Sequence, residues 1–222
     1  MWSTRVLMCA VSASVLAIWG CSSAPKFVFK NEPWRADEER QCLASGYVRA
    51  NPFLVERVAL GGPEPCGAIK PFEMTAVADG HVQLRPPAMV RCPMVPAVER
   101  WVRETVRPAA RHYLGRDLVE LKVAASYSCR AINHVVGGRL SEHGHANALD
   151  VSAFILSDGD VVTVKGAWRG DARESAFLRA VHDGACQEFS TVLGPNHDRM
   201  HHDHFHMDLA RRGRDGTDRV CK

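Results

Sequence analysis

The chain lacks several motifs that would assign a function directly. No two cysteines have the Cys-x-x-Cys spacing of a zinc ribbon or a thioredoxin-like redox site. The Gly-x-Ser-x-Gly elbow of serine hydrolases is missing, and so are the zinc-hydrolase motifs His-Glu-x-x-His and His-x-His-x-Asp-His. Any metal chemistry in this chain must therefore come from a different set of ligands.

An excess of charge of one sign is also lacking. The 222 residues include 28 lysines and arginines against 25 acidic residues, and no basic run is interleaved with aromatic side chains. Proteins that bind nucleic acid usually carry a basic stripe or patch, so we expect no nucleic-acid partner. With 46% hydrophobic and 24% charged residues, the composition is that of an ordinary globular protein with one buried core.

No hydrophobic run at the N-terminus is long enough to span a membrane. The uncharged run from Val6 to Gly20 is shorter than the roughly 20 residues that a spanning helix needs. Residues 1–21 are therefore predicted to be an export signal that delivers the protein to the periplasm. Ile18-Trp19-Gly20-Cys21 approximates a lipobox, which predicts a lipid anchor at Cys21, and plain secretion with cleavage near Ala24 is the alternative. The polar residues 22–36 are predicted to be a tether before a domain at 37–222.

Export changes the interpretation of the cysteines. In an oxidising compartment, an even number of cysteines outside the signal predicts disulfides. The six are Cys42, Cys66, Cys92, Cys129, Cys186 and Cys221. Sequence alone leaves many pairings open, and we predict Cys42 with Cys66, Cys92 with Cys129, and Cys186 with Cys221.

Hydrophobic periodicity predicts an α+β domain. Helices are expected at residues 36–45, at 92–114 with a kink at Pro108, and at 171–189. Strands are expected at 82–84, 118–126, 148–156 and 161–164, the last two joined by a turn at residues 157–160. The rest of residues 53–90, rich in Gly and Pro, is predicted to form loops. This order favours a small antiparallel sheet flanked by helices, with disulfide-stabilised loops.

Histidine is concentrated in two short windows, residues 141–150 and 201–206. They hold six of the eleven histidines, namely His143, His145, His201, His202, His204 and His206. Strand alternation would place His202, His204, His206 and Asp208 on one face and turn Asp203 to the other.

Asp150 lies in an otherwise apolar run and needs a partner, because burying an unpaired charge costs several kcal/mol. A zinc ion held by His143, Asp150 and one histidine of the second window would be that partner. Three protein ligands would leave the fourth position to water, as in catalytic zinc sites.

These residues carry a resemblance to known families. Ser141-x-His143-x-x-Ala146-x-Ala148-x-Asp150 resembles the Ser-x-His-x-x-Gly-x-Ala-x-Asp signature of a group of zinc peptidases. That group includes the D-alanyl-D-alanine dipeptidases and carboxypeptidases, the penicillin-insensitive murein endopeptidase and the hedgehog signalling domain. The spacing His201-x-x-His204-x-His206 is similar to that of the murein endopeptidase. One departure is Ala146, which places a methyl group where the signature has glycine.

Four further segments resemble the bacterial extensin-like C-terminal family, over most of the chain after about residue 40. They are Tyr127-Ser-Cys-Arg130, Ala185-Cys-Gln-Glu-Phe189, Val192-Leu-Gly-Pro195 and His204-Phe-His-Met-Asp208. This resemblance implies a small α+β zinc-peptidase-like fold.

The resemblance also implies roles for individual residues. The zinc ligands would be His143, Asp150 and His206, with His204 preferred to Asp203 as the general base and with His201 supporting the site or contacting substrate. Arg130, together with Tyr127, would hold a substrate carboxylate, although an ion pair that closes the loop near Cys129 is an equal alternative. Ser141 is expected to support the ligand loop, and His145 and His202 to be bystanders.

Together these observations predict an exported, zinc-dependent peptidase that cuts peptidoglycan peptide stems as a D,D-endopeptidase or carboxypeptidase. Its contact with the membrane would be through the lipid anchor only. An alternative is a zinc-containing but catalytically weak module that binds the cell wall or a protein. A periplasmic metal buffer would need looser and more numerous exposed sites.

Overall fold

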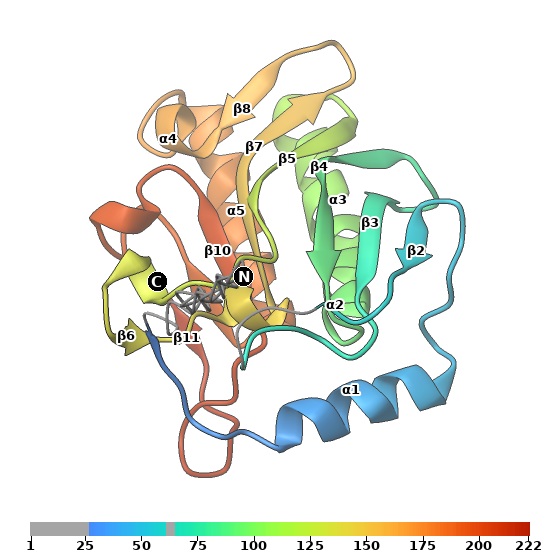
Figure 1. Cartoon of the computed structure of the whole chain (residues 1–222). Helices are drawn as coiled ribbons and strands as arrows, with labels where there is room; N and C mark the ends of the chain where they lie inside the picture. The colour runs from blue at the N-terminus through green and yellow to red at the C-terminus, as the bar shows by residue number, and fades with distance from the viewer. Residues whose placement is uncertain (1–26, 61–64) are drawn as a thin grey trace, which may run out of the picture.

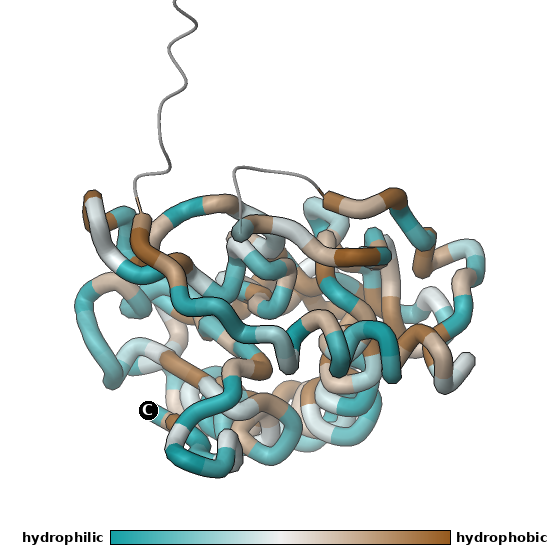
Figure 2. The backbone as a smooth tube through the Cα atoms, turned by 60° about the horizontal axis from the view of Figure 1, so that its bottom comes forward, coloured by the Kyte–Doolittle hydropathy of each residue, from teal (hydrophilic) through white to brown (hydrophobic). Residues whose placement is uncertain are grey.

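The computed structural model describes residues 27–60 and 65–222. The predicted export signal, with Cys21, and residues 22–26 of the predicted tether lie outside the described residues. Within the described ranges, no helix is long and apolar enough to cross a membrane. Hydrophobic and hydrophilic residues are interspersed along the described backbone (Figure 2).

A nine-stranded sheet forms the centre of the molecule (Figure 1). Eight strands follow the order β11-β9-β10-β7-β5-β4-β3-β2, and β8 pairs with β7 beside them. Their bounds are β2 Leu54–Glu56, β3 Phe72–Val77, β4 Val82–Val90, β5 Leu118–Ala125, β7 Ala148–Leu156, β8 Val161–Thr163, β9 Thr191–Leu193, β10 Phe205–Asp208 and β11 Val220–Cys221. The predicted α+β class is confirmed. The sheet is larger than predicted, and its β4–β5 and β9–β11 pairs are parallel.

Two of the additional strands, β2 and β3, come from residues 53–90, where the prediction of loops was wrong. The strand β4 pairs with β5 at Gln83–Arg85, and it pairs with β3 both at Val82–Gln83 and at Ala88–Val90. Pro86 and Pro87 lie between these stretches, where the register shifts and no ladder hydrogen bond is required from them. Proline is tolerated at such an irregularity, so the Pro-Pro pair did not end the strand.

The predicted helix at 92–114 is confirmed, and it packs behind the sheet (Figure 1). It comprises α2 (Met94–Arg100), the π-helical η1 (Trp101–Val106), α3 (Arg107–Ala109) and the π-helical η2 (Ala110–Leu114). Pro108 does not end the helix. The Arg107 N–H, just before it, donates to the Val102 carbonyl five residues back, and this wider register accommodates a proline that has no N–H. Gly115, at φ 67°, ends the helix.

The second long helix, α5 (Ala172–Glu188), also agrees with the prediction. Asp171 caps it by accepting hydrogen bonds from the N–H groups of Arg173 and Glu174. Between the helices and the sheet lies an aromatic cluster in which Phe154 contacts Trp101, Phe177 and Phe205 at ring-centroid distances of 6.3, 5.3 and 6.3 Å. This cluster fixes β7 and β10 against the helices. The short α4 (Val164–Ala167) follows β8.

Part of the predicted tether is ordered against the domain. The strand β1 (Phe27–Val28) pairs in parallel with β6 (Gly138–Arg139), and α1 (Trp34–Ser45) begins two residues before the tether was predicted to end. Arg35 forms an ion pair with Glu142 at 2.6 Å, and its guanidinium lies 4.4 Å from the Trp34 ring centroid. The segment before α1 is thereby joined to residues 138–142.

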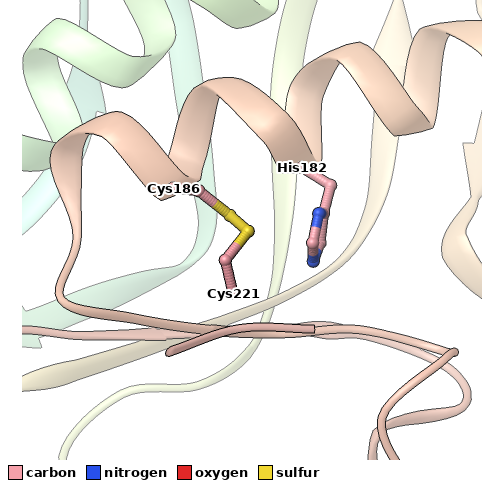
Figure 3. A group of neighbouring side chains, drawn as sticks. All are labelled: His182, Cys186 and Cys221. Atoms are coloured by element: carbon pink, nitrogen blue, oxygen red, sulfur yellow. A yellow bond between two sulfur atoms is a disulfide. The ribbon is translucent and has the colours of Figure 1, made fainter. Parts of the chain in front are cut away.

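Three disulfides cross-link the domain. The predicted Cys186–Cys221 pair is confirmed (Figure 3). The other two predicted pairs are wrong, because Cys42 bonds to Cys92 and Cys66 bonds to Cys129. The α1 helix lies against the start of the long helix, where Arg91 donates to Glu38 at 2.8 Å, and this packing brings Cys42 to Cys92. Such a tertiary contact is not encoded in the spacing of the cysteines.

Phe154→Ala is expected to lower the free energy of unfolding by about 3–5 kcal/mol, because it removes a fully buried ring that contacts three others. Urea unfolding followed by circular dichroism measures the change. As a control, Val161→Ala removes a side chain from a residue that is 53% exposed and should cost no more than about 0.5 kcal/mol. Similar losses for the two variants would contradict the assignment of the core.

Candidate metal centre

Three metal-ligating side chains converge where β7 and β10 lie side by side. Asp150 and His206 are directly opposite each other in the antiparallel register. His143 comes from η4 (Glu142–His145), the 3₁₀ turn directly before β7. The Asp150 carboxylate oxygens lie 3.1 Å from His143 Nε2 and 2.9 Å from His206 Nδ1, and these two nitrogens are 3.2 Å apart. One atom from each residue thus faces a common point, and the group could hold a metal ion.

The remaining ring nitrogens of both histidines are occupied by protein acceptors. His143 Nδ1 donates to the Ser126 carbonyl at 2.5 Å, and His206 Nε2 donates to Asp208 Oδ2 at 3.0 Å. Metal-binding histidines usually donate their second ring N–H to a carbonyl or carboxylate in this way, which fixes the ring and the tautomer. The sequence predicted Asp208 on the face of His206 but no role for it. Strand alternation could have predicted this contact, because residues two apart on a strand lie on the same face.

Burial and pairing together set the charges of this centre. His143, Asp150 and His206 are 1%, 4% and 9% exposed. Burial would raise the pKa of Asp150, but its hydrogen bonds with His143 and His206 lower that pKa well below the usual range. Burial would also lower the pKa of His206, but Asp150 and Asp208 raise it to about 9. Without metal, His206 is therefore a cation at neutral pH, held between two carboxylates.

The turn that carries His143 depends on two local features. Ser141 Oγ accepts a hydrogen bond from the His143 N–H at 3.4 Å, so Ser141 caps the turn as predicted. Ala146 ends the turn in the left-handed region, at φ 50°. Glycine adopts that conformation with less strain than alanine does. Ala146 is fully buried and does not line the cleft, so its methyl group does not narrow it.

The Cys66–Cys129 disulfide supports the turn that carries His143. Gly67 N–H donates to the Gly144 carbonyl at 2.8 Å, and Ser128 N–H donates to the His143 carbonyl at 3.1 Å. A Cβ built on Gly144 would lie 3.4 Å from Cys66 Sγ. The two cysteines thus lie next to residues that hold the turn on both sides.

A cleft of about 750 Å³ opens over the centre. Its lining includes His143, Asp150 and His206, together with the two predicted catalytic residues, His201 and His204. His204 Nε2 lies 3.7 Å from Asp150 Oδ2, and its Nδ1 donates to Asp203 Oδ1 at 2.9 Å. His201 Nδ1 donates to Asp198 Oδ1 at 2.7 Å, and its ring centroid is 5.9 Å from that of His206. Each of these histidines therefore has a carboxylate on Nδ1.

The alternation of side chains that was predicted from His202 onward begins later in the structure. Because β10 begins only at Phe205, His204 lies in a bend and His202 in the preceding turn. His202 is exposed, and its Nδ1 donates to the Arg199 carbonyl at 2.8 Å. Asp203 was predicted to turn away from His204 but bonds to it instead. His145 lines the cleft without joining the three-residue group, and burial followed by the charge of Arg35 lowers its pKa to about 4.

The two predicted substrate-binding residues differ in position. Arg130 lines the cleft, where its Nη1 donates to the Ala131 carbonyl at 3.4 Å, and no carboxylate of the described residues forms an ion pair with it. The alternative of an ion pair that closes the loop near Cys129 is therefore not seen in the described part of the chain. Tyr127 is half-buried and is not among the cleft residues, and burial raises its pKa.

A separate group of potential ligands, His182, Cys186 and Cys221, lies at α5 and β11 (Figure 3). Both sulfurs are joined in the disulfide and cannot act as thiolates. His182 Nε2 donates instead to the carbonyl of Lys222 at 3.2 Å. This group is therefore a structural contact between the helix and the end of the chain.

The fold and the cleft define an α+β protein with a buried His-Asp-His centre. Residues 40–222 match the family model described as Extensin-like protein C-terminus. The chain belongs to this family. Comparisons with curated proteins and with solved structures gave no match.

Zinc binding at neutral pH is expected to release about one proton from His206. The raised pKa, about 9, keeps the ring protonated below that pH, and a metal must displace the proton from Nδ1. Affinity should therefore rise with pH up to about 9. Calorimetric titration in buffers of different ionisation enthalpy counts the protons. Asp208→Asn removes one of the two carboxylates beside His206, so this variant should release fewer protons when it binds zinc. Zinc binding by the unsubstituted chain without any proton release would contradict this charge assignment.

Removing the Cys66–Cys129 disulfide should weaken metal binding more than removing Cys186–Cys221. Each paired Cys→Ser variant is expected to lose about 2–5 kcal/mol of stability. Only the variant without the Cys66–Cys129 disulfide loses support for the turn that carries His143. Competition with a chromophoric chelator measures zinc affinity in the folded variants. Equal affinities would show that the disulfide does not position His143.

Proposed function

We propose that the chain is an exported, zinc-dependent peptidase that acts on the peptide stems of peptidoglycan. The observation that carries the proposal is the convergence of His143, Asp150 and His206 beneath a cleft that also contains His204. Two imidazole nitrogens and one carboxylate oxygen are a typical ligand set for catalytic zinc. When bound there, zinc would polarise a peptide carbonyl and lower the pKa of a water molecule.

His204 is the general base in this proposal. Its Nδ1–H is bonded to Asp203, so the lone pair is on Nε2, which lies 3.7 Å from Asp150 Oδ2 and thus beside the proposed metal position. A base must lie within hydrogen-bond reach of the water whose proton it accepts. The bond to Asp203 also stabilises the imidazolium that forms, although Asp203 is about half exposed and solvent weakens this effect.

Arg130 would orient the substrate through a carboxylate. A guanidinium binds a carboxylate in a bidentate manner, and Arg130 lies in the cleft with no ion-pair partner among the described residues. Peptidoglycan stems carry free carboxylates, so they suit this cleft. The resemblance of the 141–150 and 201–206 windows to zinc peptidases of the cell wall supports the same substrate class.

The three disulfides support a periplasmic location. Three disulfides suit an oxidising environment such as the periplasm. Residues 1–21 would be the export signal, with Cys21 as the site of the lipid anchor. The first described strand, β1, lies only a few residues after Cys21, so an anchored enzyme would work close to the membrane surface.

The test is digestion of purified peptidoglycan sacculi with and without a chelator, followed by separation of the released muropeptides. Loss of cross-linked dimers identifies an endopeptidase, and shortened stems identify a carboxypeptidase. His204→Ala should lower kcat by about 10²–10⁴-fold while keeping its zinc, because it removes the base and not a ligand. His202→Ala, which changes an exposed histidine of the same segment, should keep full activity.

Unchanged muropeptides, from a chain that still holds one zinc ion tightly, would contradict the peptidase. The protein would then be better described as a zinc-containing module that binds the cell wall or another protein.

A further inference from the structure

A second group of potential metal ligands lies at the rim of the cleft, on the loop between β9 and β10. His197 Nε2 is 3.3 Å from Asp198 Oδ2, and His201 Nδ1 is 2.7 Å from Asp198 Oδ1. One carboxylate thus lies between two imidazoles, with ligand atoms of all three residues within 4.8 Å of one another. The buried centre has the same pattern, in which each oxygen of Asp150 faces a nitrogen of a different histidine.

Local hydrogen bonds hold this loop in shape. Asp198 caps the 3₁₀ turn η5 (Arg199–His201) by accepting from the N–H groups of Met200 and His201 at 2.7 and 3.1 Å. His197 N–H donates to the Gly194 carbonyl at 2.9 Å. The backbone is therefore arranged before any ligand binds, and little chain ordering opposes binding.

We propose that His197, Asp198 and His201 bind a second divalent cation, and that zinc suits this nitrogen and oxygen donor set best. Binding here should be weaker than at the buried centre. The side chains of His197 and Asp198 are 29% and 37% exposed, so water competes for the ion. Asp198 Oδ1 also accepts two backbone hydrogen bonds, which leaves it a poorer ligand.

Filling the second site would act on the cleft through His201. A cation on Nδ1 replaces the hydrogen bond to Asp198 and brings positive charge beside His204 and His206, whose ring centroids lie 5.4 and 5.9 Å from that of His201. If the proposed peptidase activity holds, the first zinc equivalent should activate the enzyme and excess zinc should inhibit it. This consequence rests on the proposed function, whereas the binding of the second ion does not.

Zinc binding to the purified full-length chain tests the proposal directly. Equilibrium dialysis against increasing zinc, with metal measured by atomic emission, should give two ions per chain, the second bound more weakly. His197→Ala should lose the weaker ion and keep the tight one. His143→Ala should lose the tight ion instead. Asp198→Asn keeps a capping side chain but loses the charge, and it should also lose the weaker ion.

His202→Ala is the matched control, because it removes an exposed histidine five residues along the chain, and it should still bind two ions. A single ion in the unsubstituted chain at saturating zinc would overturn the proposal. So would a second ion that persists in His197→Ala, since that ion would be adventitious surface zinc only. Two ions that respond to these variants, in a chain that leaves sacculi intact, would uphold the second site and contradict the peptidase.

Discussion

Burial of the Asp150 carboxylate constrains most of what surrounds it. A charge in the middle of a sheet is stable only if it is paired and fully hydrogen-bonded. Two histidines provide that pairing, and their second nitrogens need acceptors in turn, which are the Ser126 carbonyl and Asp208. A chain of polar contacts thus runs from Ser126, directly after β5, to β10. In such a chain, losing one member leaves its neighbours unsatisfied, so the site and the fold are not independent.

The architecture supplies this pairing from three directions. The β7–β10 register places Asp150 opposite His206, and the aromatic cluster around Phe154 holds both strands against the helices. The turn at 142–145 is secured by Ser141 and by the Cys66–Cys129 disulfide. Glu142, beside His143, accepts hydrogen bonds from Arg35 and Asn147, so α1 is joined to the turn as well. Rigid support on every side is what a preorganised metal site needs.

The sequence predicted those features that depend on local pattern. The apolar period of residues 94–114 and the Asp171 cap specified the two long helices, and the apolar run around Asp150 specified β7. The concentration of histidine in two windows pointed to the three residues that the structure brings together. Asp208 could have been assigned from the same alternation, because it is two residues from His206.

Features that depend on tertiary contacts could not be predicted in this way. The Pro86-Pro87 pair suggested a loop, but a register shift between β3 and β4 accommodates both prolines. The partner of Cys42 depends on how α1 packs against the start of the long helix, which the spacing of cysteines does not record. Alternation failed at His202 because the ladder of hydrogen bonds begins only at Phe205, so the residues before it are free to turn. For the same reason, the sequence did not predict that Asp203 would bond to His204 or that Asp198 would bond to His201.

The most direct test of this account is a crystal structure of the zinc-loaded chain, with anomalous scattering measured on both sides of the zinc absorption edge. The account predicts a zinc peak about 2.0–2.2 Å from His143 Nε2, His206 Nδ1 and an oxygen of Asp150. His143 Nδ1 should still be bonded to Ser126 and His206 Nε2 to Asp208. Direct hydrogen bonds between Asp150 and both histidines, with no anomalous peak between them at saturating zinc, would contradict it.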